Sequence, residues 1–285
     1  MRSLHRVRTA AWARGLLLTT TLSLPIGIGL SVAQSSAGAS GLASATATYH
    51  GLGWDNCGLP TVSQLTAWTK ANSPYKTVNV YIGGVNAACP QAPASSWVQS
   101  VTKLGMDLIP TYVGLQAPVN TSCPCAKISP TKAYSQGVAA AADAVKIMAA
   151  AGIGKGNPIY EDMEGYDRVK ENVNSVRTYL KGWTVELHKL GYVSGVYVGE
   201  SSGVKDLVAV YGTKYVEPDD IWIAYWDGAR TVTDPSIPAA DWANHQRLHQ
   251  FQGGGKISAG GVTFSGVDLN FCDGAVVSAA SLTGG

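Results

Sequence analysis

The chain has 285 residues, of which 14% are charged and 46% are hydrophobic, and its formal net charge is +2. Residues 1–39 hold four of the 21 Lys+Arg and none of the 19 Asp+Glu, so the remaining 246 residues carry a formal charge of −2. A weakly acidic chain lacks the basic surface that attracts nucleic acids or anionic membranes, and we expect neither as a partner.

Residues 1–39 have the parts of a secretory signal peptide. Basic residues from Arg2 to Arg14 precede an apolar run over residues 16–32, and Ala37-Gly38-Ala39 offers small residues for cleavage. A retained N-terminal anchor is the alternative. Because no second long apolar run follows, we expect no integral membrane segment in the mature chain. We predict a secreted protein, extracellular or associated with the cell wall, with a flexible stretch over residues 40–50 and one domain over residues 51–285.

Five cysteines follow the predicted signal peptide: Cys57, Cys89, Cys123, Cys125 and Cys272. Export favours disulfides, and an odd count leaves at least one thiol unpaired within a monomer, which is the expected oligomeric state. The pairing stays open. Since Cys123-Pro-Cys125 is too tight for the usual zinc pair and no histidine lies nearby in the sequence, we predict no metal site.

The hydrophobic pattern alternates between strands and helices along the chain. We predict strands over residues 51–55, 78–82, 107–113, 157–165, 192–198, 221–227, 248–252 and 264–271, and helices over residues 61–71, 97–104, 130–151, 171–190, 204–211 and 238–245. Thr61 with Gln64 forms a capping box, and Pro130 fits a first helical turn. Glycines at 105, 152 and 191 close three of the helices.

Eight strands that alternate with helical segments predict an α/β fold, and we expect a closed (β/α)₈ TIM-like barrel as a single domain. An open doubly wound sheet is the alternative. The sequence has no G-x-G-x-x-G and no phosphate-binding loop, so a nucleotide site has no support and we predict no cofactor.

The segment Asn157–Gly165 has three carboxylates within four residues. On an extended strand, Asp162 and Glu164 share one face about 6 to 7 Å apart, while Glu161 points to the other face and is expected to be structural. Two acids this close at a strand end are costly unless they are solvated, paired or used. We therefore predict an acid and its charged partner in a glycosidase-like site.

In barrels of this kind the functional groups lie at the carboxyl ends of the strands. Polar residues at those positions, together with the aromatic residues on the same strands, suit a sugar, because rings stack on aromatic faces while carboxylates and amides bind hydroxyl groups. The acids are Asp55, Asp162, Glu164 and Asp268, and the predicted substrate-binding residues are Tyr81, Tyr112, Tyr225, Trp226, Asp227, Gln250, Gln252 and Asn270.

Several of these motifs together resemble a known family. They are Gly51-Leu52-Gly53-Trp54-Asp55, Tyr81-Ile82-Gly83-Gly84, Ile109-Pro110-Thr111-Tyr112-Val113-Gly114, Tyr160-Glu161-Asp162-Met163-Glu164 and Gly266-Val267-Asp268-Leu269-Asn270. The combination resembles the glycoside-hydrolase-like domain family of secreted bacterial proteins, a domain of unknown function, which is similar to the family 25 glycoside hydrolases, the barrel lysozymes. The resemblance implies a (β/α)₈-like barrel and a cell-wall glycan ligand of the peptidoglycan type with N-acetylated sugars.

The resemblance also implies roles for the acids. Glu164 matches the proton donor, and Asp162 matches the group that stabilises developing positive charge or positions an acetamido group. Asp55 and Asp268 match residues that hold the reacting ring or tune the pKa of the acid. Retaining, inverting and substrate-assisted hydrolysis all stay open, because the separation on a strand falls between the classes.

Two other functions remain as alternatives. A non-catalytic glycan-binding barrel would have the same sequence, since stacking aromatics and hydrogen-bonding acids serve binding as well as cleavage. An esterase is less favoured: Gly199-Glu200-Ser201-Ser202-Gly203 fits a nucleophile elbow, with Asp227 and His245 or His249 downstream, but no His-Gly-Gly oxyanion loop precedes it.

Overall fold

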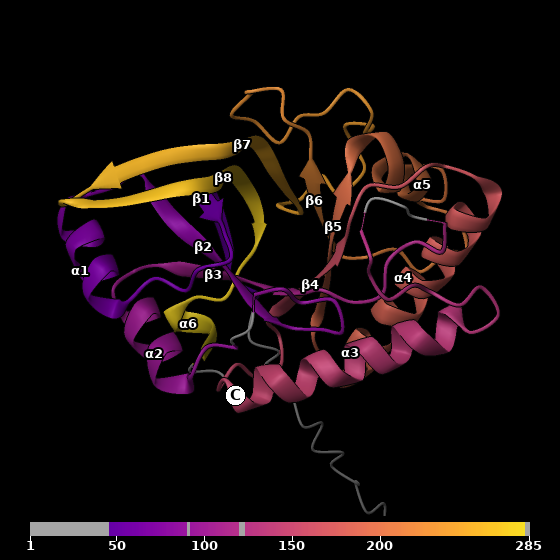
Figure 1. Ribbon diagram of the computed structural model, residues 1–285, viewed down its shortest axis with the longest axis horizontal. Coiled ribbons are helices and arrows are strands. Elements are labelled where there is room, and N and C mark those ends of the chain that lie inside the picture. The colour runs from indigo at the N-terminus through magenta and orange to yellow at the C-terminus, as the bar shows by residue number, and fades with distance from the viewer. Residues whose placement is uncertain (1–45, 90–91, 120–122, 283–285) are drawn as a thin grey trace, which may run out of the picture. The chain divides into compact units, whose positions relative to one another are not determined.

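In the computed structural model, which describes residues 46–89, 92–119 and 123–282, eight strands close into a barrel (Figure 1). They follow one another around the barrel in chain order: β1 Thr48–Asp55, β2 Tyr75–Gly83, β3 Asp107–Tyr112, β4 Pro158–Met163, β5 Val193–Gly199, β6 Asp220–Ala224, β7 Arg247–Ala259 and β8 Val262–Ala275. The predicted barrel is confirmed.

The N-terminal predictions meet the structure only at β1. The predicted signal peptide, residues 1–39, lies outside the described residues. Strand β1 begins at Thr48 rather than at Gly51, and its first residues pair with β8, with Thr48 opposite Ala275 and His50 opposite Asp273. Residues 48–50 of the expected flexible stretch therefore belong to the barrel.

Strand β8 departs from an all-parallel barrel. Strands β1 to β7 pair with one another in parallel, whereas β8 runs antiparallel to both β7 and β1. The reason is the connection between β7 and β8, which is the dipeptide Gly260-Gly261. Both glycines have positive φ, at 58° and 76°, as tight hairpin turns require, and a two-residue connection can join only antiparallel strands.

The hairpin of β7 and β8 extends beyond the barrel beside helix α1 (Figure 1). On this arm, Phe264 contacts Trp68 of α1, with a ring-centroid separation of 5.2 Å, and stacks on Trp54 at 5.4 Å. The tip also lies close to the helix, since a side chain at Gly260 would meet the backbone of Ala67. The last two strands thus take the place of the outer helices that a full (β/α)₈ repeat would add.

Helices follow the first five strands. They are α1 Val62–Lys70, α2 Ser95–Lys103, α3 Ala133–Ala150, α4 Lys170–Leu190, and the short pair η1 Glu200–Val204 and α5 Lys205–Val208; α6 Ala279–Leu282 follows β8. The capping box before α1 is confirmed, with Thr61 N donating to Gln64 Oε1 at 2.8 Å and Gln64 N donating to Thr61 Oγ1 at 3.2 Å. Gly191 ends α4 in the left-handed conformation, as predicted.

The helix expected over residues 238–245 is wrong. This segment forms turns, and Trp242 and His245 have positive φ, at 46° and 55°. The left-handed backbone is compatible with isolated residues but not with a right-handed helix. Contacts elsewhere hold it: the Trp242 indole donates to Pro218 O at 2.8 Å, and His245 Nδ1 lies 2.6 Å from Asp273 Oδ1.

The long helices α3 and α4 approach closely through two glycines. An added Cβ at Gly182 would overlap Tyr134 O, and one at Gly137 would overlap Tyr179 O. We expect Gly182→Ala to lower the free energy of unfolding by about 1–3 kcal/mol, because a backbone carbonyl cannot rotate away and the helices must separate.

Chemical denaturation measures this loss, and Gly154→Ala is the matched control. A Cβ at Gly154 has no neighbour within 4 Å, so this variant should change stability by less than about 1 kcal/mol. Equal stabilities of the two variants would contradict the close helix packing.

Two disulfides and one buried thiol account for the five cysteines. Cys57 bonds to Cys89, linking the segments that follow β1 and β2, and Cys123 bonds to Cys125 within the segment between β3 and α3. Cys272 on β8 is buried and unpaired, in keeping with the odd count. Across the described residues, no group of three or more His, Cys, Asp or Glu side chains is placed to hold a metal ion.

The inside of the barrel changes from apolar to polar along its length. Ile109, Tyr160 and Trp222 belong to one buried cluster, together with Leu248 and Cys272 from the last two strands. Strand alternation puts buried polar residues next to this cluster, among them Asp55, Asn79, Thr111, Asp162, Gln250 and Asn270. These residues form the floor of the candidate site.

Candidate functional site

The structure brings the four predicted acids together at one end of the barrel. Asp55 ends β1 and lies directly opposite Asp268 in the β1–β8 register, while Asp162 and Glu164 come from the end of β4. Their charges influence one another: those of Asp268 and Glu164 help to raise the pKa of Asp55, and those of Glu164 and Asp55 help to raise the pKa of Asp162.

Asp55 is held from two sides by amide groups. Gln250 Nε2 lies 3.1 Å from both carboxylate oxygens, and Asn270 Nδ2 lies 2.6 Å from Oδ2. Burial raises the pKa of Asp55 to about 7 although both amides favour the ionised form. This carboxyl therefore keeps its proton to higher pH than an ordinary aspartate does.

The amides are fixed by aromatic donors in turn. Gln250 Oε1 accepts from Tyr197 Oη at 3.0 Å and from Trp226 Nε1 at 2.9 Å, and Asn270 Oδ1 accepts from Trp222 Nε1 at 2.8 Å. Because the oxygen and the nitrogen of each amide both have a hydrogen-bond partner, each of the two side chains has one favoured orientation. The frame therefore fixes the position of Asp55.

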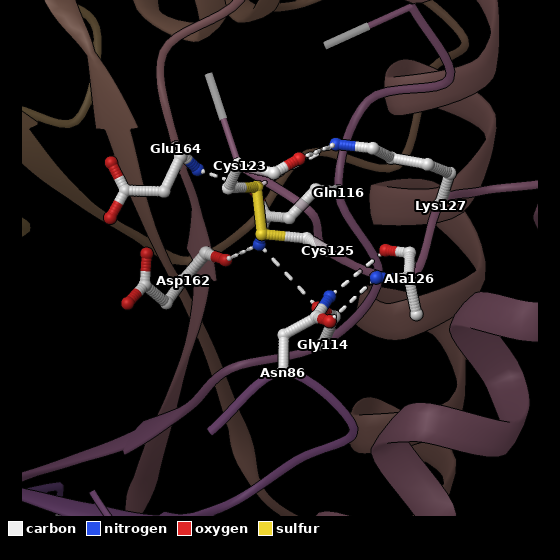
Figure 2. Close-up of a disulfide and its surroundings, with 9 residues drawn as sticks. All are labelled: Asn86, Gly114, Gln116, Cys123, Cys125, Ala126, Lys127, Asp162 and Glu164. Carbon is white, nitrogen blue, oxygen red and sulfur yellow. Dashed lines mark hydrogen bonds between the residues drawn. A yellow bond between two sulfur atoms is a disulfide. The ribbon is translucent and has the colours of Figure 1, made fainter. Parts of the chain in front are cut away.

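Asp162 is buried, with 6% of its surface exposed, and its Oδ1 has no hydrogen-bond partner among the described residues. Burial is the largest cause that raises its pKa well above the ordinary value. Glu164 lies at the mouth, where partial desolvation of its carboxyl, followed by the charge of Asp268, raises its pKa as well. Figure 2 shows the two carboxylates extending in the same direction.

Gln116 fixes the backbone between these two acids. Its Nε2 donates to Asp162 O at 2.8 Å, and its Oε1 accepts from Glu164 N at 2.9 Å (Figure 2). Sequence reasoning missed this residue. It lies in the long irregular segment after β3, where no local pattern distinguishes a glutamine that hydrogen-bonds to the backbone of a neighbouring strand.

A cavity of about 470 Å³ opens beside these residues. Its lining includes Tyr81, Asn86, Gln116, Asp162 and Glu164, together with Cys123 and Cys125, which are joined by a disulfide. Its size suits a sugar ring with substituents, because small-ligand sites span about 300–1,000 Å³.

Two tyrosines line the acidic region. Burial and then the charges of the nearby acids raise the pKa of Tyr81 on β2 and of Tyr197 on β5, so both keep their hydroxyl protons as donors. Tyr81 was predicted as a substrate-binding residue, whereas Tyr197 was missed. The sequence did contain an indication of this residue, because Tyr197 lies near the carboxyl end of the strand predicted over residues 192–198.

Tyr225 and Trp226 form an aromatic rim after β6. They are 40% and 65% exposed, and the Trp226 ring lies against Gly253, where any side chain would overlap it. The adjacent Asp227 closes a turn, accepting from Ala229 N at 2.8 Å, and lies 3.6 Å from His249 Nε2. Gln252 is exposed on β7 opposite Leu269.

Tyr112 does not join the cluster. It is buried on the outer side of β3, where its hydroxyl donates to Asp143 Oδ2 at 3.1 Å and its ring packs on Trp183. Strand alternation is the cause, since Ile109 and Thr111 take the inner positions. Glu161 is likewise buried on the outer side of β4, as expected, and accepts from Tyr179 Oη at 2.8 Å.

The esterase arrangement is not assembled within the described part of the chain. Ser201 is exposed on η1 and has no hydrogen bond there to either histidine. His245 pairs with Asp273, whereas His249 is buried between Thr231 O at 2.6 Å and Tyr225 O at 2.8 Å.

A closed α/β barrel with paired carboxylates, amides and aromatic rings at one end defines a glycoside-hydrolase-like protein. The family model of the Rv2525c-like, glycoside hydrolase-like domain matches residues 66–272, and the chain belongs to this family. The predicted family is confirmed. A search of curated protein sequences finds no match to the chain.

Solved structures share the fold at low sequence identity. The Mycobacterium tuberculosis Tat-secreted protein Rv2525c, in complex with L-tartrate, is 19% identical, with a TM-score of 0.53 over 80% of this chain and 99% of its own. An uncharacterized B. stearothermophilus protein is 16% identical, with a TM-score of 0.51 over 78% and 95%. The modular autolysin LytC from Streptococcus pneumoniae is 12% identical, with a TM-score of 0.50 over 78% and 46%.

None of the helices over residues 46–89, 92–119 and 123–282 is long and apolar enough to cross a membrane.

Proposed function

We propose that this protein hydrolyses a cell-wall glycan of the peptidoglycan type, built from N-acetylated sugars, in the acidic cavity. The observation that carries the proposal is the pair at the end of β4, where the buried Asp162 and the exposed Glu164 lie side by side in a cavity of about 470 Å³ and both have raised pKa values. Glycoside hydrolysis needs one protonated and one ionised carboxyl at the same bond.

Glu164 is the proposed proton donor. It faces the opening of the site, where a leaving-group oxygen can reach it, and its raised pKa keeps it protonated closer to neutral pH. Asp162 is the proposed stabiliser. Burial favours its neutral form in the free site. With a ring bound, the proton of the pair lies on Glu164, and the ionised Asp162 stabilises the positive charge that develops on the ring as Glu164 gives that proton to the leaving oxygen.

The remaining groups support binding of the ring. Asp55, in its amide frame, and Asp268, which accepts from Gly254 N at 2.7 Å, hold hydroxyl groups or the acetamido group. The exposed ring of Trp226 offers a face for stacking at the rim, beside Tyr225. At the edge of this aromatic rim lie Asp227 and Gln252, whereas Asn270 acts through Asp55, to which it donates.

Cell-wall association and secretion are part of the same proposal. The basic and apolar N-terminal segment fits a signal peptide, and two disulfides are typical of an oxidising compartment. The similar Mycobacterium protein is described as Tat-secreted, and LytC as an autolysin. A monomer is the proposed state.

Release of reducing ends from purified peptidoglycan tests the proposal. We expect the mature protein to release them in proportion to enzyme concentration and time. A protein that sediments with peptidoglycan but releases no reducing ends between pH 4 and 9 would overturn hydrolysis. That outcome would establish the second candidate, a glycan-binding barrel, which the fixed position of Asp55 between two amides favours, because it suits this carboxylate to hydrogen bonding.

A further inference from the structure

The two disulfides close loops of very different size. Cys57 and Cys89 are 32 residues apart, and their bridge joins two separate loops. This bridge therefore strongly reduces the conformational freedom of the unfolded chain. Cys123 and Cys125 are two residues apart, so their bridge closes a very small loop and reduces the conformational freedom of the unfolded chain far less. Cys123 and Cys125 are half-buried and line the acidic cavity, which Cys89 also lines, while Cys57 is exposed. Solvent and small molecules can therefore reach both bridges, and loop size and neighbouring charge distinguish them.

A lysine ammonium lies against one sulfur of the short bridge. Lys127 Nζ is 3.6 Å from Cys123 Sγ and donates to Cys123 O at 3.1 Å, and Figure 2 shows the side chain reaching towards this cysteine. Across the described residues, no carboxylate forms an ion pair with Lys127. Its charge is therefore available to a thiolate at Cys123.

The base of the loop is held independently of the bridge. Asn86 Nδ2 donates to Gly114 O at 2.7 Å and to Ala126 O at 2.9 Å, while Asn86 Oδ1 accepts from Ala126 N at 2.7 Å (Figure 2). The backbone of Gln116 adds two bonds, to Ala126 O at 3.0 Å and from Ile128 N at 2.8 Å. Opening of the sulfur–sulfur bond leaves these contacts in place.

We propose that Cys123–Cys125 is a reactive disulfide that exchanges with low-molecular-weight thiols. A thiolate attacks Cys125 Sγ and forms a mixed disulfide, while the S–S electron pair passes to Cys123 Sγ, which leaves as a thiolate beside Lys127. A second thiolate then attacks the sulfur of the bound thiol and releases Cys125. Two thiols are oxidised to one disulfide, their two protons pass to the solvent or to the protein thiols, and the bridge gains two electrons.

The test compares the two bridges in the folded, full mature chain. The protein is incubated with dithiothreitol or reduced glutathione without denaturant, quenched, alkylated with a maleimide and mapped by peptide mass spectrometry. We expect Cys123 and Cys125 to be alkylated at least about tenfold faster than Cys57 and Cys89. Equal rates, or faster opening of Cys57–Cys89, would overturn the proposal.

Variants of Lys127 test the role of the ammonium. We expect Lys127→Met to slow the opening of the short bridge by about 3- to 10-fold, and Lys127→Arg to restore most of the rate because it keeps the positive charge. Lys132→Met, at an exposed lysine outside this contact, is the control and should leave the rate unchanged.

A wild-type rate in Lys127→Met would show that the ammonium does not assist the leaving sulfur and would overturn that part of the chemistry. Circular dichroism and the rate at Cys57–Cys89 report on folding in each variant. The wild-type comparison needs no variant, so the reactivity of the bridge is tested even if a substitution lowers stability. No glycan is involved, and the result is independent of the proposed hydrolysis.

Discussion

Glu164→Gln is expected to lower the rate of reducing-end release from peptidoglycan by about 10²–10⁴-fold, the usual contribution of a general acid. Glutamine keeps the size of the side chain but has no acidic proton to give to the leaving oxygen. Because Glu164 N, and not the side chain, bonds to Gln116, the backbone clamp survives the substitution. Circular dichroism and thermal unfolding should therefore match the wild type.

Glu171→Gln is the matched control, since Glu171 is exposed in the first turn of α4. This variant should hydrolyse the glycan at the wild-type rate. If Glu164→Gln also does so, then Glu164 is not the proton donor. Sedimentation with peptidoglycan separates the steps, because the loss should lie in turnover and not in binding.

The pH dependence of hydrolysis gives a second measure of the same acid. Its raised pKa keeps Glu164 protonated to higher pH than an ordinary glutamate, and activity should fall as the pH rises through that pKa. Asp268→Asn removes a negative charge that contributes to the shift and keeps an oxygen for Gly254 N. The alkaline limb of the pH–activity profile should then move to lower pH. An unchanged limb would contradict an effect of the Asp268 charge on the pKa of Glu164.

Asn270→Leu is expected to lower the free energy of unfolding by about 2–5 kcal/mol, because it leaves the buried Trp222 indole N–H without its acceptor and leaves Asp55 with Gln250 as its remaining amide donor. Asp55 Oδ2 loses a donor at 2.6 Å and Trp222 Nε1 loses its acceptor at 2.8 Å, while the volume of the side chain is nearly kept. Urea denaturation measures the loss, and Asn174→Leu, at an exposed position of α4, is the control with an expected change within about 0.5 kcal/mol.

The loss should grow with pH. Folding raises the pKa of Asp55 to about 7, so the folded state holds this proton more tightly, and its stabilising effect is complete below about pH 4 and is lost as the pH rises through 7. Removal of the Asn270 donor raises this pKa further. We expect Asn270→Leu to be more destabilising at pH 8 than at pH 5, and a loss below about 1 kcal/mol at both pH values would contradict the frame around Asp55.

The sequence was sufficient to predict the residues whose placement follows from strand alternation alone. Asp162 and Glu164 are two residues apart at a strand end, and Asp55, Gln250 and Asn270 fall near the carboxyl ends of the strands predicted over residues 51–55, 248–252 and 264–271. In a closed barrel the carboxyl ends of the strands meet, so residues predicted at those ends are expected to lie in one site. Asp268 reaches the site although β8 is reversed, because it lies opposite Asp55 in the register.

Other residues depend on contacts that no local pattern contains. Tyr112 is at the end of β3 but faces the helices, since its neighbour Thr111 takes the inner position. Gln116 acts from an irregular segment on a strand 46 residues further along the chain. The reversal of β8 was readable in principle, because Gly260-Gly261 between two strand-like runs is a hairpin signal, but regular alternation of the earlier units outweighed it.

The seam between β1 and β8 has a consequence for the order of folding. Asp55 and the Asn270 that holds it are 215 residues apart, so their contact is among the last that a growing chain can form. A ribosome-bound or truncated chain that lacks β8 contains Asp162 and Glu164 but neither Asp268 nor Asn270. The frame around Asp55 is therefore incomplete until β8 has been synthesised and has closed the barrel against β1.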